Sequence, residues 1–252
     1  MKNIIYILAL LFSTVVFPQN EMLFEQANTL YNQGKYAEAI DKYTAILDTE
    51  NHSTELYFNL ANAHYKLNNI APSIYFYEKA LQLSPNDKEI INNMAFAKNM
   101  TIDAIDVIPE TGLSKFIKNI TNMMSFDAWA KTSVAFVLCF VILFLIYYFA
   151  YSTINKRLAF IGSLISLLLL CVSLGLAFRK FSIDKNNKPA IVFAQESKVK
   201  SEPNSRSEES FRLHEGTKVQ VLDTVNSWKK IKLADGKTGW VNSDDIKLLH
   251  NF

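Results

Sequence analysis

The chain has 252 residues, enough for one large domain or for two or three small ones. Half of its residues are hydrophobic and 20% are charged, which excludes an intrinsically disordered chain. The net charge of +2 comes from 26 basic and 24 acidic residues, which excludes a nucleic-acid binder that works by bulk positive charge. The apolar residues are concentrated in a few long runs, which argues against a wholly soluble single-domain enzyme.

The N-terminal end has the pattern of a secretory signal, because Lys2 precedes an apolar run over residues 4–17. That run is short for a membrane-spanning helix. Val15, Phe17 and Pro18 are not the small residues that a cleavage site requires, so an uncleaved anchor is the alternative. We therefore expect residues 1–19 to be a signal peptide or an N-terminal anchor, and either one would export the residues that follow.

An internal repeat follows, because residues 21–48 and 55–82 match at nine of 28 positions with an offset of 34 residues. This is the period of tetratricopeptide repeats, which these residues resemble. Gly34 can adopt the left-handed conformation that ends the first helix of the first unit. Pro85 would stop the second helix of the second unit. The resemblance predicts an α-solenoid over 20–104, with units at 20–53 and 54–87 and a third, capping helix at 88–104.

The resemblance to tetratricopeptide repeats implies a concave groove that binds extended peptides or partner helices. Its groove-facing positions carry aromatic, asparagine and lysine side chains here, namely Phe24, Asn28, Tyr31, Phe58, Asn62, Tyr65, Lys66, Asn92 and Phe96. Stacking of one unit on the next is an alternative role for Tyr31 and Tyr65. Residues 20–100 carry 6 basic and 10 acidic residues, which mildly favours a basic partner.

Two uncharged runs, 132–151 and 158–178, predict a transmembrane helical hairpin. As helices, each run would reach roughly 30 Å, the thickness of a bilayer core. The export signal places the loop 152–157 on the cytoplasmic side, and Lys156 and Arg157 in that loop fit this orientation. Neither run contains an ionisable side chain of the kind that a transporter uses, so we expect an anchor and a packing surface.

The residues just before the hairpin, 105–131, predict a linker and an interfacial helix. Apolar residues recur at helical spacing from Leu113 to Met124, whereas Lys115 and Lys118 lie off that stripe. Trp129 would then lie at the depth of the lipid headgroups. Packing of this helix against the repeats is the alternative.

After the hairpin, over 182–252, short alternating runs separated by turns predict a small all-β barrel. The runs LHEGT, WKKIK and DGKTGWV resemble those of bacterial SH3-type domains. The resemblance implies binding of cell-wall peptides or of other proteins, with Trp228 and Trp240 as the candidate recognition surface. Burial in the core is the alternative for Trp240.

The sequence carries no recognisable catalytic or metal-binding motif. Its four histidines are scattered without HxxxH or HExxH spacing, and it has neither a GxxxxGK phosphate loop nor a GxSxG elbow. We therefore predict that the protein is not an enzyme and uses no metal and no cofactor.

The order of the modules, from export signal through repeats and hairpin to the SH3-type barrel, resembles the BatE proteins of bacterial aerotolerance operons. The resemblance implies a multidomain protein of the bacterial inner membrane with its soluble domains in the periplasm. It also implies partners that are membrane proteins with von Willebrand A domains or other tetratricopeptide proteins, and no nucleic acid. We predict a scaffold in an envelope-stress complex; the alternative is an envelope anchor that binds peptidoglycan through the SH3-type domain.

Overall fold

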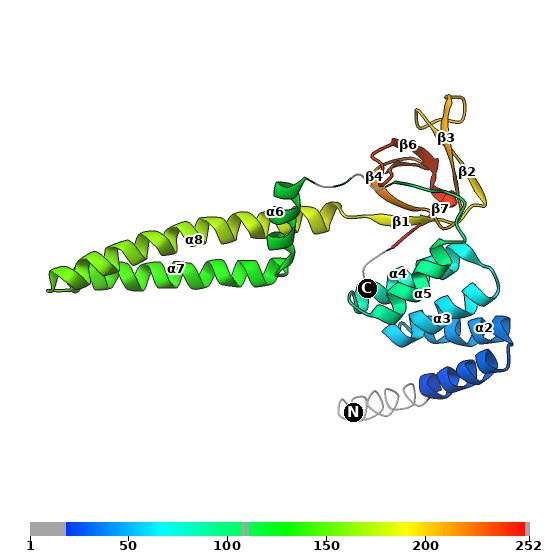
Figure 1. Ribbon diagram of the computed structural model, residues 1–252, viewed down its shortest axis with the longest axis horizontal. Helices are drawn as coiled ribbons and strands as arrows, with labels where there is room; N and C mark the ends of the chain where they lie inside the picture. Colours follow the sequence, from blue (N-terminus) through cyan, green and yellow to red (C-terminus); the bar gives the residue numbers. More distant parts are fainter. Residues whose placement is uncertain (1–18, 107–108, 110, 250–252) are drawn as a thin grey trace, which may run out of the picture. The chain divides into compact units, whose positions relative to one another are not determined.

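The computed structural model describes residues 19–106, 109 and 111–249. Its contacts divide the chain into two compact units. The first unit combines the helices of the N-terminal part with the strands of the C-terminal part, and the second is the helical segment between them (Figure 1). The predicted signal or anchor lies outside the described residues, apart from residue 19.

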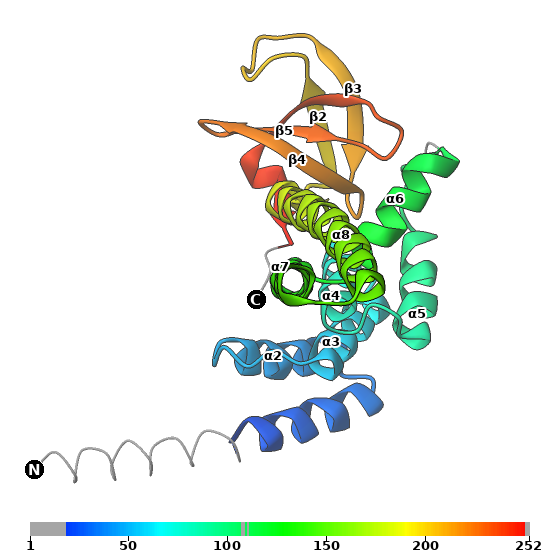
Figure 2. The same cartoon turned by 90° about the vertical axis from the view of Figure 1, so that its left-hand side faces the viewer.

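Successive antiparallel helices build the N-terminal part of the first unit (Figure 2). Residues 19–32 are helical, and four helices follow them: α2 (Tyr36–Leu47), α3 (Thr54–Lys66), α4 (Ile70–Leu83) and α5 (Lys88–Lys98). Ala27 and Ala61 are fully buried, and their small side chains let the paired helices approach closely. These elements have the helical-pair pattern that the 34-residue period predicts.

The turns inside the two helix pairs use a left-handed residue at matching positions. Gly34 has φ +78° and Asn68 has φ +60°. Asparagine is one of the few residues other than glycine that tolerates this conformation, so the replacement of glycine in the second pair does not break the repeat.

The third helix is shorter than predicted, because α5 ends at Lys98 and not at residue 104. The residues after it do not continue the helix or form a free linker. Ile105 packs against the core of the C-terminal strands, and Asp103 accepts hydrogen bonds from them. The segment after this helix is therefore held by contacts with a distant part of the chain.

The C-terminal part of the first unit is a single antiparallel sheet, curled on itself (Figure 2). Its strand order is β3-β2-β6-β5-β4-β1-β7. Val219, Val221, Ile231 and Val241 lie in its buried core, as the alternating pattern predicts. The elements are β1 (Pro189–Val192), β2 (Glu196–Lys200), β3 (Glu209–His214), β4 (Lys218–Val225), β5 (Trp228–Lys232), β6 (Thr238–Asn242), the short helix η1 (Ser243–Asp245) and β7 (Ile246–Leu248).

The helices and the sheet share one hydrophobic core. Ile191 of β1 and Leu249, just after β7, are buried in the same cluster as Ile74 and Tyr75 of α4. The Tyr75 hydroxyl donates a hydrogen bond of 3.4 Å to a backbone carbonyl of β7. The ammonium group of Lys247 lies 4.6 Å from the centroid of the Tyr75 ring, a cation–π contact. The helices and the sheet therefore form one compact unit and not two domains joined by a linker.

Charged groups reinforce the same interface. Glu78 of α4 is nearly buried and accepts from Lys218 of β4 at 2.7 Å, with Lys98 of α5 at 3.6 Å. Because the Glu78 carboxylate is shielded from water, it depends on these two lysines to offset the cost of its burial. The interface is thus specified by polar contacts as well as by apolar burial.

The second unit contains α6 (Gly112–Asn122) and a helical hairpin of α7 (Phe126–Phe149) and α8 (Thr153–Asn186). Small residues line the contact between α7 and α8. The hydroxyls of Ser133 and Ser173 lie 2.9 Å apart, and Ser166 donates to the carbonyl of Phe136 at 2.8 Å. Both hairpin helices are long and apolar enough to cross a membrane, judged by length and composition alone.

Candidate functional site: the concave groove of the repeats

A groove of about 330 Å³ is lined by side chains from the repeat helices. The lining is mainly aromatic and amide, with one lysine and one glutamate. It comprises Tyr31, Asn62, Tyr65, Lys66, Tyr77, Glu89, Asn93 and Phe96. A surface of this kind offers flat apolar area together with hydrogen-bonding groups, which suits a polypeptide ligand.

Asn62 is held in a defined orientation at the floor of the groove. Its side-chain oxygen accepts hydrogen bonds from the hydroxyl of Tyr77 and from the amide nitrogen of Asn93 at 3.2 Å. Both hydrogen bonds go to the oxygen. Within the described residues, the amide nitrogen of Asn62 donates no hydrogen bond. The groove therefore presents an amide donor whose direction is fixed by its neighbours.

The same arrangement occurs one repeat earlier. The side-chain oxygen of Asn28 accepts from the hydroxyl of Tyr43 at 2.6 Å and from the amide nitrogen of Asn59 at 3.0 Å. Burial raises the pKa of Tyr43 to about 12, and it raises the pKa of Tyr77 as well. Both phenols therefore stay protonated at neutral pH and act as donors to the asparagines.

Five of the nine groove residues predicted from the sequence line this groove, namely Tyr31, Asn62, Tyr65, Lys66 and Phe96. The other four do not. Phe58 packs its ring 6.0 Å from that of Tyr77, and Asn28 is engaged with Tyr43. Asn92 is exposed on α5 outside the lining, and Phe24 lies in a separate cavity of about 380 Å³.

Three lining residues, Tyr77, Glu89 and Asn93, were not among the predicted groove residues. Tyr77 repeats Tyr43 at the 34-residue offset, so the repeat carried a signal for it. Asn93 repeats Asn59 in the same way. Their role became visible only when the contacts to Asn62 and Asn28 were known.

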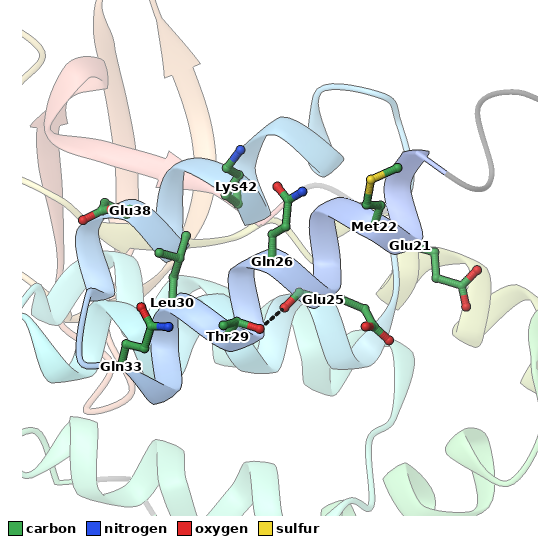
Figure 3. Close-up of a pocket in the computed structure, with 9 residues that line it drawn as sticks. All are labelled: Glu21, Met22, Glu25, Gln26, Thr29, Leu30, Gln33, Glu38 and Lys42. Atoms are coloured by element: carbon green, nitrogen blue, oxygen red, sulfur yellow. Dashed lines mark hydrogen bonds between the residues drawn. The ribbon is translucent and has the colours of Figure 1, made fainter.

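Another cavity, of about 810 Å³, lies between helix 19–32 and α2 (Figure 3). Figure 3 shows Met22, Gln26 and Lys42 pointing into the same space from these two helices. The positions one repeat later, at an offset of 34, are Leu56, Leu60 and Phe76, which pack against the first repeat.

Within the described residues, no further helix pair covers the face lined by this cavity. Gln26 and Lys42 are polar, whereas the residues at the same positions of the second repeat, Leu60 and Phe76, are apolar. Polar residues are expected at the end of a solenoid that must stay soluble. We therefore treat this cavity as a solvent-facing end and not as the candidate site.

In the sheet, Trp228 and Trp240 are half-buried and lie outside the hydrophobic core cluster. The strand register places both on one face with Lys230, because Trp228 pairs with Asn242 and Lys230 pairs with Trp240. The ammonium of Lys230 lies 6.0 Å from the Trp240 ring centroid. The core face of the same strands carries Ile231 and Val241. The two tryptophans therefore form a partly accessible surface on the C-terminal sheet.

Over residues 19–106, 109 and 111–249, no cluster of three or more histidine, cysteine, aspartate or glutamate side chains could hold a metal ion. The two cysteines, Cys139 and Cys171, are free and lie in the hairpin helices.

Comparison with known proteins identifies the two soluble modules. The family of tetratricopeptide repeats matches residues 54–87, and the family of bacterial SH3 domains matches residues 197–247. Both are typically non-catalytic interaction modules. No curated protein matches the chain.

Two solved structures of similar sequence come from one kind of protein. The first tetratricopeptide domain of Spaghetti (RPAP3), bound to the HSP90 peptide SRMEEVD, is 25% identical; the match covers 32% of this chain and 90% of that one, with a TM-score of 0.23. The NMR structure of the first such domain of human RPAP3 is 24% identical, with 32% and 91% covered and a TM-score of 0.23. The chain thus combines a tetratricopeptide repeat, two apolar helices long enough to cross a membrane and a bacterial SH3 domain.

Proposed function

We propose that this protein is a non-enzymatic, membrane-anchored scaffold that binds partner proteins in the groove of its repeats. The observation that carries the proposal is the orientation of Asn62 in the groove: its side-chain oxygen accepts hydrogen bonds from Tyr77 and Asn93, which leaves its amide nitrogen to donate to a ligand. Phe96, with 60% of its surface exposed, supplies apolar area beside it. A partner's backbone carbonyls would accept from the amide, and its apolar side chains would cover the ring.

The shared core of repeats and SH3 module supports a hairpin topology. The two hairpin helices lie between these modules in the chain, yet Ile191 and Leu249 are buried with Ile74 and Tyr75. Modules that share a core must lie on one side of a membrane, so the chain between them must cross it an even number of times. Two spans satisfy that condition.

The proposed side is the periplasm of a bacterial inner membrane, because the apolar run over residues 4–17 has the pattern of an export signal. In this proposal the protein belongs to the BatE type and acts in an aerotolerance or envelope-stress complex. Its partners there are membrane proteins with von Willebrand A domains and other tetratricopeptide proteins. A single cysteine in the loop after α7, in a chain without Cys139 and Cys171, should react with a membrane-impermeant maleimide only after cell lysis.

Site-specific photo-crosslinking tests the groove in intact cells. A benzoylphenylalanine at position 96 should form a discrete adduct with a von Willebrand A or tetratricopeptide protein. The same probe at position 91, which is exposed on α5 but does not line the groove, should not. Lys66→Glu should weaken the adduct at position 96, whereas Lys88→Glu on α5 should not. Equal labelling from positions 96 and 91 would contradict the proposal.

A second candidate function is wall binding, which is favoured by the match to bacterial SH3 domains and by the half-buried Trp228 and Trp240 on one face of the sheet. The full chain in detergent micelles would then sediment with purified peptidoglycan. Trp240→Ala should abolish sedimentation, and Leu222→Ala, an exposed apolar control on β4, should not. A natural chain that does not sediment would remove this candidate, and sedimentation that survives Trp240→Ala would show that Trp240 is not part of the binding surface.

A further inference from the structure

Helix α6 exposes an apolar face that the rest of the described chain does not cover. Leu113 and Phe116 are 72% and 61% exposed, and Met123, just after the helix, is 75% exposed. With Ile120 they recur at helical spacing, so they share one face. Lys115 and Lys118 lie on the opposite side. The helix is therefore strongly amphipathic, and its apolar side needs a covering medium.

The C-terminal end of α6 is fixed to the hairpin. The indole N–H of Trp129, in α7, donates to the carbonyl of Thr121 at 3.2 Å, and Thr121 is fully buried. Lys180 of α8 donates to the side-chain oxygen of Asn122 at 3.3 Å and pairs with Asp184 at 2.9 Å. These contacts hold the helix across the end of the hairpin where α7 begins and α8 ends (Figure 1).

Apolar side chains of the hairpin are exposed at the same end. Phe126 and Val134 of α7 are 37% and 59% exposed, and Phe178 of α8 is 64% exposed. The apolar surface of α7 and α8 therefore continues onto α6. The simplest arrangement is that the same surroundings cover all three helices. For a hairpin that crosses a bilayer, these surroundings are lipid, and an amphipathic helix fixed at its end lies in the headgroup layer.

Cations gather at this end of the hairpin. Lys115, Lys118, Lys131 and Arg179 are all exposed. Within the described residues no carboxylate forms an ion pair with Lys115, Lys131 or Arg179. The nearby carboxylates are few: Asp184 is paired with Lys180, and Asp127 lies in the first turn of α7. Such an excess of positive charge beside an apolar face is complementary to lipid phosphates.

We propose that α6 lies in the headgroup layer of the membrane, with its apolar face toward the acyl chains, and that the exposed cations beside it bind anionic lipid headgroups. The proposal rests on the membrane hairpin of the proposed function and adds a lipid-binding site to it. Through Trp129 and Lys180, lipid contacts of α6 would also steady the end of the hairpin that leads to the soluble unit.

Depth-dependent fluorescence quenching in lipid nanodiscs tests the position of α6 in the full chain. Cys139 and Cys171 are replaced by serine, and a single cysteine carrying an environment-sensitive fluorophore is placed at position 116, 114 or 142. Spin-labelled lipids with a shallow label should quench position 116, and those with a deep label should quench position 142 in α7. Position 114, which is exposed and lies away from the apolar face of α6, should instead be quenched by aqueous iodide.

The charge requirement is tested with phosphatidylcholine nanodiscs made with and without phosphatidylglycerol. The anionic lipid should raise shallow quenching at position 116 severalfold. Replacement of Lys115, Lys118, Lys131 and Arg179 by glutamine should remove that increase. An identical signal in both lipids would overturn the headgroup site.

The three probe positions separate failure of this inference from failure of the proposed anchor. Deep quenching at position 142 with iodide quenching at position 116 would overturn the inference and leave the hairpin intact. A lack of deep quenching at position 142 would overturn the membrane hairpin itself. Protection of position 116 from iodide without lipid quenching would mean that protein covers the face, which also overturns the lipid proposal.

Discussion

The carboxylate of Asp103 accepts hydrogen bonds from both N–H groups of His214. The backbone N–H of His214 lies 2.7 Å from one carboxylate oxygen, and its ring Nδ1 lies 2.7 Å from the other. Because an ionised carboxylate only accepts, Nδ1 carries the proton in this contact. The hydroxyl of Thr217 adds a third donor at 2.6 Å. The segment that follows the repeats is thereby tied to the turn between β3 and β4.

We predict that Asp103→Asn loosens this joint. Burial by itself would raise the pKa of Asp103, but hydrogen bonds from His214 and Thr217 lower it below its ordinary value. The neutral amide would lose acceptor capacity against three donors, at a cost of about 1–3 kcal/mol. Hydrogen exchange of β3 in the full chain should become faster by about fivefold or more. Asp106→Asn, at an exposed carboxylate three residues away, is the matched control and should leave exchange unchanged.

The contact between Asp103 and His214 should also make the stability of the fold depend on pH in acid. A carboxyl group with a lowered pKa in the folded state stabilises the fold fully above its ordinary value of 3.8. That contribution is lost as the pH falls from this value through the lowered one. Faster exchange of β3 below pH 4 should therefore be seen in the natural chain and not in Asp103→Asn. The same acid response in both would show that another group is responsible.

Gly216 and Gly34 form a matched pair for testing the packing of the sheet on the repeats. Both have positive φ, +85° and +78°. A Cβ on Gly216 would come within 2.9 Å of the side chains of Ile70 and Ile74, whereas one on Gly34 would meet nothing within 4 Å. Gly34→Ala should cost about 1 kcal/mol of backbone strain, and Gly216→Ala about 1–3 kcal/mol more because of overpacking. Thermal unfolding of the full chain measures the difference, and equal costs would argue against a tight interface.

His64 should make the first unit sensitive to mild acid. Burial, and secondarily the charge of Lys247, lowers the pKa of His64 to about 4 from its ordinary 6.5. Between these values the unfolded chain binds a proton that the folded chain does not, so stability falls as the pH falls from 6.5 toward 4. Because the ring is partly exposed, we expect a loss of about 1–2 kcal/mol. His64→Phe keeps the stacking on Phe76 and should flatten stability measured across this range.

Apolar substitutions at the polar end of the solenoid should make the chains associate. Gln26→Leu with Lys42→Phe gives the first repeat the residues that its second repeat buries, Leu60 and Phe76. The exposed apolar face should then drive end-to-end association of chains. Mass photometry in micelles should detect dimers of the double variant. A chain that stays monomeric at every concentration would show that this end has no stacking geometry left.

Much of the local structure could be predicted from the sequence, because it depends on neighbours in the chain. The 34-residue period located the helix pairs, since Ala27 and Ala61 mark close helix contacts wherever they recur. Alternation marked the core strands through Val219 and Val221. Long uncharged runs marked the hairpin helices. Periodicity reports which face of an element is apolar, and that face is set by residues a few positions apart.

Contacts between distant residues were decided only by the tertiary structure. No pattern indicated that Asp103 would meet His214, 111 residues away, or that Gly216 would lie against Ile70 and Ile74. These contacts join two modules that look separate in the sequence. Likewise, the sequence placed asparagines on the groove side, but only packing against Tyr77 and Asn93 decided which end of the Asn62 amide is left for a ligand. Hydrogen-bond partners depend on where elements dock, and docking depends on the shapes of whole surfaces, which a one-dimensional pattern does not encode.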